Sequence, residues 1–126
     1  MTPAVALLVE DEPLVAFVAA ESLSALGFDV AVAETGAAAL AAMAQPRTPG
    51  LALVDVGLPD VRGDELALQL RRLAPGLRLV LASGYDAGAL RAQLDDPSIA
   101  VMPKPYGERL LRETLVSLGF HLPPDN

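Results

Sequence analysis

Short apolar runs alternate with segments of helical pattern along the whole chain, and this alternation constrains the fold more than any other feature. Five apolar runs predict strands, which span residues 4–9, 28–33, 51–55, 77–82 and 98–102. The segments that follow them predict helices, which span residues 13–26, 37–44, 64–73, 86–94 and 108–118. A chain that alternates strands with helices builds a parallel sheet with right-handed crossovers. We therefore predict an α/β fold, a doubly wound five-stranded parallel sheet with helices on both faces.

Three predicted helices carry apolar residues at helical spacing, and these residues indicate the faces that pack on the sheet. We expect burial of Leu14, Val15, Val18, Leu23 and Leu26 in the first helix, of Leu66, Leu70 and Leu73 in the third, and of Leu110, Leu111, Thr114, Leu115 and Leu118 in the fifth. Gly27 is well placed to end the first helix.

Length, charge and residue content exclude several classes of protein. The 126 residues fit one domain, expected at 1–120, with a frayed tail at 121–126. The absence of cysteine excludes disulfides, thiol catalysis and thiolate metal sites. The net charge of −7 and the scattered basic residues argue against a nucleic-acid partner. With no signal peptide and no apolar stretch of about 18 residues, we expect no membrane partner and a cytoplasmic location.

Polar side chains follow four of the predicted strands at the point where each strand ends. They are Glu10 and Asp11, Asp55, Ser83, and Lys104. The carboxyl ends of parallel strands meet at one edge of a sheet, where open α/β sheets bind their ligands. These residues, far apart in the sequence, are therefore predicted to converge on one pocket.

Glu10, Asp11 and Asp55 would place three carboxylates in one small space. Such a cluster repels itself unless a cation is present, and hard oxygen ligands suit Mg²⁺. An aspartate at this position can also act as a nucleophile towards phosphorus. A lysine and a hydroxyl nearby would neutralise and bind the phosphoryl oxygens, as phosphoryl transfer requires.

Each of these residues also has a simpler interpretation. The acidic run Glu10–Glu12 favours the start of the next helix, and Asp55 suits a turn before Gly57. Ser83 could cap the helix after it, and Lys104 could be a solvated loop charge. Lys104 lies between two prolines, and whether the bond that follows it is cis is left open.

Three stretches, Leu8–Pro13, Leu53–Pro59 and Met102–Pro105, resemble the signatures of receiver domains of two-component response regulators. The resemblance covers essentially the whole chain. It implies strand order 2-1-3-4-5 and Mg²⁺-dependent transfer of a phosphoryl group from the phosphohistidine of a histidine kinase or histidine phosphotransfer protein. It also implies a changed affinity for an unknown downstream protein, with no turnover of a separate substrate.

The same resemblance assigns a role to each residue of the predicted pocket. Asp55 would be the phospho-acceptor, Ser83 the switch hydroxyl and Lys104 the lysine of the family pattern. Asp11 would bind the metal directly beside Glu10 and Asp55, and the backbone carbonyl of Gly57 would be a further ligand.

Two features depart from the family pattern. Val101 stands where typical receivers carry the aromatic partner of the switch hydroxyl. The stretch Leu81–Tyr85 is similar to an atypical subgroup with a Phe-Ala-Thr-Gly-X-Tyr-type motif. Tyr85 or Tyr106 could supply the missing ring, although we favour an ordinary loop role for both. Gly57 leaves the phosphoryl group open to water, so we expect an acyl phosphate of limited lifetime unless Tyr85 shields it.

Other classes of function stay open at this point. A phosphohydrolase of the haloacid-dehalogenase type needs a second Asp two residues after the nucleophile, where this chain has Gly57. A receiver-like module that binds without phosphorylation is kept open by Val101. Because the chain ends soon after the last helix, we expect no output domain. We also expect a monomer or weak dimer. A single-domain regulator, a phosphate relay and a receiver of a hybrid kinase are not separated.

The remaining charged residues receive no role in this interpretation. Asp60, Arg62, Asp64 and Glu65 are expected to be solvated charges of a loop and a helix start, and His121 to have no donor role.

Overall fold

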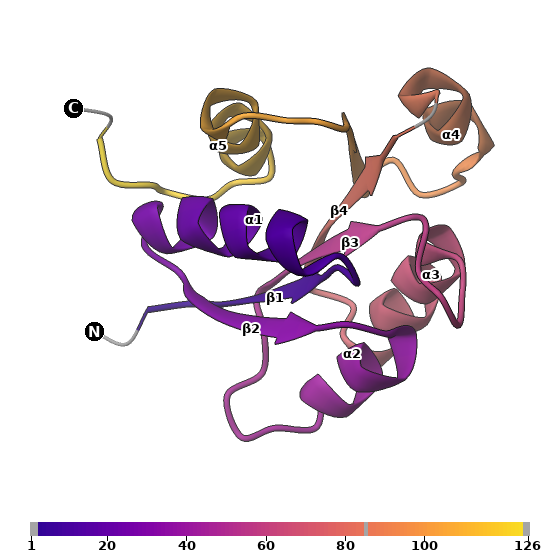
Figure 1. Cartoon of the computed structure of the whole chain (residues 1–126), viewed down its shortest axis with the longest axis horizontal. Coiled ribbons are helices and arrows are strands. Elements are labelled where there is room, and N and C mark those ends of the chain that lie inside the picture. The colour runs from indigo at the N-terminus through magenta and orange to yellow at the C-terminus, as the bar shows by residue number, and fades with distance from the viewer. Residues whose placement is uncertain (1–2, 85, 125–126) are drawn as a thin grey trace.

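The computed structural model describes residues 3–84 and 86–124, which form one five-stranded parallel sheet with helices on both faces (Figure 1). The strands are β1 Val5–Val9, β2 Asp29–Ala33, β3 Leu51–Asp55, β4 Arg78–Ser83 and β5 Ala100–Pro103. Their order in the sheet is β2-β1-β3-β4-β5, and all four pairs are parallel. The predicted fold class and strand order are confirmed.

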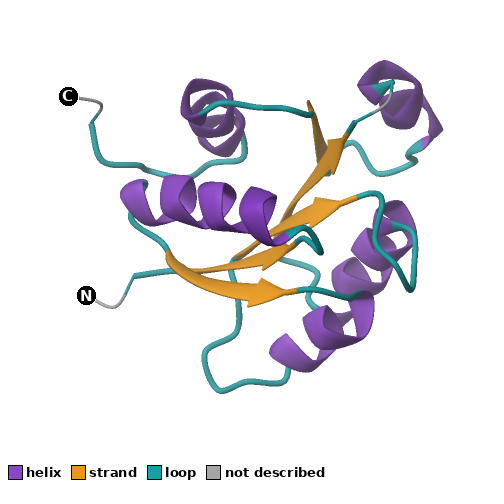
Figure 2. Cartoon of the chain, in the orientation of Figure 1, coloured by secondary structure: helices purple, strands orange, loops and turns teal. Residues whose placement is uncertain are grey.

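The helices alternate with the strands as the sequence predicts (Figure 2). They are α1 Pro13–Ala25, α2 Gly36–Ala42, α3 Gly63–Leu73, α4 Ala87–Gln93 and α5 Glu108–Ser117. The largest differences in a boundary are two residues: β5 begins at Ala100, later than predicted, and α2 ends at Ala42, earlier than predicted. Gly27 follows α1 with φ +101°, a left-handed conformation that suits glycine and ends the helix as predicted. Within the described ranges, no helix is long and apolar enough to cross a lipid bilayer.

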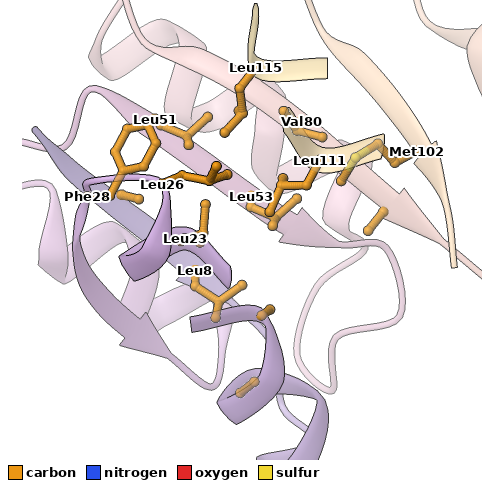
Figure 3. Packing of buried hydrophobic residues seen from close by; sticks show 14 residues of the cluster. Leu8, Leu23, Leu26, Phe28, Leu51, Leu53, Val80, Met102, Leu111 and Leu115 are labelled. Atoms are coloured by element: carbon orange, nitrogen blue, oxygen red, sulfur yellow. The ribbon is translucent and has the colours of Figure 1, made fainter. Parts of the chain in front are cut away.

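Two hydrophobic cores lie on opposite faces of the sheet, because alternate strand residues point to opposite sides. Leu8, Leu53 and Val80 face α1 and α5 (Figure 3). Leu7, Val54 and Leu79 face α2, α3 and α4. Each fully buried leucine contributes about 1.5–3 kcal/mol relative to exposure. The central strands are therefore covered on both faces and hold their carboxyl ends in a rigid frame.

The predicted inner face of α1 is wrong at its first turns. Leu14 and Val18 are 76% and 57% exposed, whereas Ala16 and Ala19 are buried. Apolar residues surround the first half of this helix, so their spacing does not select a face. The small alanines allow the helix to approach the sheet closely, and the larger side chains point outward.

Two further expectations about burial need correction. Leu73 at the end of α3 is 61% exposed, although Leu66 and Leu70 are buried as predicted. The segment after α5 is not frayed in its described part, since Leu122 packs against the α1 and α5 core. The carbonyl of Pro123 accepts a hydrogen bond from Arg112 at 2.6 Å. A hydrophobic contact and a hydrogen bond together hold this segment against the domain.

Candidate functional site

The residues that follow strands β1, β3, β4 and β5 converge at the carboxyl edge of the sheet, as predicted. Asp55 pairs in register with Ala82, and Ser83 with Pro103, so the ends of β3, β4 and β5 lie side by side. A cavity of about 610 Å³ opens over this edge, and its lining includes Asp55, Gly57, Ser83 and Lys104. In Figure 1 the arrowheads of the strands point to this common edge.

Lys104 connects the ends of β1 and β3. Its Nζ lies 3.1 Å from Oε1 of Glu10 and 3.3 Å from Oδ1 of Asp55. The Lys104 side chain is 19% exposed, and its backbone N–H donates to the Ser83 carbonyl at 2.8 Å. The Lys104–Pro105 bond is cis. The interpretation of Lys104 as a solvated loop charge is therefore wrong.

The three carboxylates of Glu10, Asp11 and Asp55 form a cluster in which ligand oxygens lie within 4.8 Å of one another. Glu10 is only 4% exposed, and its Oε2 accepts from the Glu12 backbone N–H at 3.3 Å. Glu12 occupies the position before α1 without a capping side-chain bond. Glu10 and Asp11 therefore belong to a cluster at the sheet edge, whereas Glu12 lies at the start of the helix without a capping side-chain bond.

The charges of this cluster shift each other's protonation equilibria. Burial raises the pKa of Glu10, although hydrogen bonds from Lys104 and the Glu12 backbone oppose the shift. Burial alone would lower the pKa of Lys104, but the hydrogen bond to Glu10 and the charges of Asp55 and Glu10 raise it overall. One ammonium thus contacts two carboxylates, and the third carboxylate, of Asp11, lies in the same cluster. The excess of hard oxygen donors fits a divalent cation such as Mg²⁺.

Glycines 57 and 63 shape the loop that leaves Asp55. A Cβ placed on Gly57 would lie 3.9 Å from Oδ2 of Asp55, so position 57 stands beside the carboxylate. A Cβ on Gly63 would collide with the carbonyl oxygen of Asp55 and lie 2.6 Å from Cα of Val56. Only a glycine lets the start of α3 pack against the backbone of Asp55. This role was not predicted from the sequence, although the position of Gly63 at the start of a helix is a signal that could have indicated it.

Ser83 is the last residue of β4, is 4% exposed, and lines the same cavity as Asp55 and Lys104. The side chain that caps α4 belongs to Asp86, whose Oδ1 accepts from Ala89 N–H at 3.0 Å. Asp86, and not Ser83, therefore caps this helix.

In the part of the chain that the structure describes, a valine stands at the position of the family's switch aromatic, and Tyr106 lies elsewhere. Val101 is half-buried and packs against the core under α3 and α4. Tyr106 lines a separate apolar groove beside α1, and burial, with the charges of Glu10 and Asp55, raises its pKa to about 12. Tyr85 lies outside the described residues, so the structure leaves its predicted roles as they stand.

Asp60 has a structural role that the sequence analysis missed. Its carboxylate accepts hydrogen bonds from the backbone N–H groups of Gly36 at 2.9 Å and Ala37 at 3.1 Å. These hydrogen bonds lower the pKa of Asp60. A Cβ on Gly36 would collide with Val61, so a glycine is needed for this close contact. The partners are 23 and 24 positions away in sequence, which leaves no local pattern to find.

The other residues given no role in the sequence analysis divide into two groups. Arg62 lines the cavity over Asp55 and pairs with Asp64, with Nε and Oδ1 3.0 Å apart. Glu65 and His121 are exposed, as expected for solvated groups.

Comparisons with known proteins agree with this geometry. The profile of the response regulator receiver domain matches residues 6–116. The chain is 35% identical to the probable transcriptional regulatory protein TcrX of Mycobacterium tuberculosis, over 68% of this chain and 36% of that protein. It is 31% identical to the sensor kinase CckA of Brucella abortus, over 89% of this chain and 12% of that protein. The chain therefore spans only part of these relatives.

The fold has similar solved structures. A response regulator receiver protein from Sinorhizobium medicae superposes with a TM-score of 0.83 at 22% identity, covering 92% of this chain and 94% of that one. Because the family profile matches most of the chain, this chain belongs to the response regulator receiver domain family of two-component signalling systems.

Proposed function

We propose that this domain accepts a phosphoryl group on Asp55 from the phosphohistidine of a histidine kinase or histidine phosphotransfer protein. The observation that carries the proposal is the position of the Asp55 carboxylate. It lies in an open cavity, 3.3 Å from a lysine ammonium, and within a cluster of acidic side chains. This arrangement leaves an oxygen of the Asp55 carboxylate accessible and places the positive charge of Lys104 beside it.

The reaction needs one bond exchange at phosphorus. A carboxylate oxygen of Asp55 attacks the phosphorus atom, so that an O–P bond forms while the P–N bond to the donor histidine breaks. The bonding pair leaves with the imidazole nitrogen, which takes a proton from solvent. Lys104 turns from Asp55 to one phosphoryl oxygen, and the Ser83 hydroxyl donates to another.

The acidic cluster would hold Mg²⁺ through Glu10, Asp11 and Asp55, together with the backbone carbonyl of Gly57. When bound, the ion neutralises negative charge on the phosphoryl group. Lys104 offsets part of the negative charge of the cluster, and burial, with a smaller effect from the charge of Asp55, raises the pKa of Glu10. Both features support a cluster that is completed by a cation.

The names of the relatives support the choice of partner. One relative is named a sensor kinase and another a transcriptional regulatory protein. We propose that this domain takes its phosphoryl group from a kinase-class donor, in the cytoplasm, and changes its affinity for a protein partner. We propose no turnover of a separate substrate, because the position two residues after Asp55 is Gly57 and offers no general acid.

Intact mass measurement tests the proposal. The protein is incubated with Mg²⁺ and either acetyl phosphate or a phosphorylated histidine kinase. We expect a transient phosphoryl adduct that is absent in Asp55→Asn and retained in Asp95→Asn, a matched change at an exposed carboxylate. The absence of an adduct with every donor would support a module that works without phosphorylation. Steady turnover of small phosphomonoesters would support a phosphohydrolase instead.

A further inference from the structure

Arg62 is a cation in the cavity over Asp55 to which the family resemblance assigns no role. Of the described side chains that line this cavity, Lys104 and Arg62 are the two basic ones. Lys104 is engaged with Glu10 and Asp55, whereas the Arg62 side chain is 60% exposed. The cavity therefore has one cation at its base and a second at its rim.

The backbone places the Cβ of Arg62 on the same side of the loop as the Cβ position of Gly57. Gly57 and Arg62 form an isolated antiparallel bridge across the β3–α3 loop. Residues directly opposite each other in such a pair place their Cβ positions about 4.5–5.5 Å apart on the same side. The Cβ position of Gly57 is 3.9 Å from Oδ2 of Asp55. By standard bond lengths, the guanidinium of an extended arginine lies about 6 Å from its own Cβ. This length is enough to bring the Arg62 guanidinium to the Asp55 carboxylate.

The glycine at position 57 keeps the path between the two side chains open. A side chain there would begin 3.9 Å from Oδ2 of Asp55, in the space that the Arg62 guanidinium must cross. The absence of a side chain at position 57 therefore exposes the Asp55 carboxylate to water. It also leaves space beside this carboxylate for the side chain of Arg62.

Arg62 has a weak partner in this structure. Its Nε lies 3.0 Å from Oδ1 of Asp64, and its second contact, from Nη2 to Oδ2, is 3.5 Å long. Exposed pairs of this kind contribute little to stability. A phosphoryl group carries more negative charge than a carboxylate and suits the two-pronged hydrogen bonding of a guanidinium.

We propose that Arg62 is a second cationic ligand of the phosphoryl group on Asp55, which it reaches by leaving Asp64 and crossing the space above Gly57. The proposal rests on the proposed function and extends it. Lys104 binds the anion from the base of the cavity, and Arg62 closes over it from the β3–α3 loop. The pairing of Arg62 with Asp64 is then the resting state of a two-position side chain.

Binding of beryllofluoride in the presence of Mg²⁺ tests this role, because beryllofluoride imitates a phosphoryl group on a carboxylate. The affinity is measured by amide chemical shifts at saturating Mg²⁺. We expect Arg62→Ala to weaken beryllofluoride binding roughly three- to tenfold, with Arg62→Lys between the two because it keeps the charge and loses the fork. Arg72→Ala, which removes the same charge from an exposed position on α3, should have little effect.

Two more measurements distinguish this role from a structural one. Mg²⁺ binding without beryllofluoride should be unchanged or tighter in Arg62→Ala, because a cation has been removed near an acidic cluster. Asp64→Asn should tighten beryllofluoride binding, because Arg62 loses its competing partner. In the background of Gly57→Val, whose side chain fills the path, Arg62→Ala should weaken beryllofluoride binding little further. This double-mutant cycle measures the coupling between positions 57 and 62 directly.

The outcomes separate the two proposals. If the wild-type protein neither binds beryllofluoride nor forms an adduct, the proposed function fails. If the wild-type protein binds it and Arg62→Ala behaves like Arg72→Ala, the role of Arg62 is overturned while the proposed function stands. A parallel loss of Mg²⁺ and beryllofluoride binding in Arg62→Ala would show a structural role. An unchanged affinity in Asp64→Asn would exclude the exchange of partners.

Discussion

At the scale of single residues, the site is a cluster of unequal charge. Lys104 contacts Glu10 and Asp55, and Asp11 adds a third carboxylate within 4.8 Å. Such an arrangement is costly for folding, because buried charges that are not balanced raise the free energy of the native state. The raised pKa of Glu10, caused first by its burial, expresses this cost. This free-energy cost is explained if the function of the cluster is to bind a cation and a phosphoryl group.

Gly57 should set the lifetime of the acyl phosphate. Replacing it with valine places a side chain 3.9 Å from Oδ2 of Asp55 and hinders the approach of water. We expect the half-life of the phosphoryl adduct, followed by intact mass, to lengthen roughly several-fold in Gly57→Val. Gly76→Val is the control, because a Cβ there meets nothing within 4 Å. An equal or shorter half-life in Gly57→Val would contradict this prediction.

At the scale of elements, helices α1 and α2 are each positioned by contacts that their own sequences do not reveal. Helix α1 packs through Ala16 and Ala19 and leaves Leu14 and Val18 exposed. Helix α2 receives its cap in part from Thr35 and in part from Asp60, which lies in the β3–α3 loop. The loop that carries Gly57 is therefore tied to a helix on the same face of the sheet.

The packing face of α1 gives a stability prediction. Ala19→Leu forces a larger side chain between helix and sheet and should lower the free energy of unfolding by about 1–3 kcal/mol. Val18→Ala, on the exposed side, should change it by no more than about 0.5 kcal/mol. Urea denaturation measures both. A larger loss for Val18→Ala than for Ala19→Leu would restore the face predicted from the sequence.

The clamp between Asp60 and α2 gives a pH-dependent prediction. Hydrogen bonds from Gly36 and Ala37 lower the pKa of Asp60 in the folded protein. The stabilisation is therefore present above the ordinary Asp pKa, about 3.9, and is lost as the pH falls through the lower, folded value. Asp60→Ala should destabilise the protein at neutral pH, and the difference from wild type should shrink in acid.

Two measurements check the clamp. The amide protons of Gly36 and Ala37 should exchange faster in Asp60→Ala than in wild type, because they lose their acceptor. The control Asp95→Ala removes an exposed carboxylate without such a contact, and its effect on stability should not follow this pH dependence. If exchange at both amides is unchanged in Asp60→Ala, the clamp does not hold α2.

At the scale of the whole molecule, the site lies where the strand order reverses. The chain passes from β1 outward to β2 and then returns to the other side of β1 to form β3. The loops after β1 and β3 therefore separate, and open α/β sheets bind ligands in the crevice formed there. Lys104 and Glu10 are 94 positions apart in sequence but 3.1 Å apart in space. The parallel sheet, with a core on each face, brings these residues together.

Much of this fold could be predicted because its signals are local. The alternation of apolar runs with helical segments places all five strands and helices. The convergence of Glu10, Asp55, Ser83 and Lys104 follows once the strands are parallel, since it requires only that each residue stands at a strand end. The cap made by Asp60 and the position of Arg62 could not be predicted, because both depend on how a loop folds back over the sheet edge.

Local sequence patterns were sufficient to predict the order of elements, the parallel sheet and the set of polar residues at its carboxyl edge. These properties follow from hydrophobic periodicity and from the position of a residue at the end of a strand, which are encoded within a few neighbours. The tertiary structure alone decided which face of α1 is buried, that Lys104 bridges Glu10 and Asp55, and that Arg62 faces the same cavity. These depend on close packing and on contacts between distant segments, where volume and charge act through space and leave no period in the sequence.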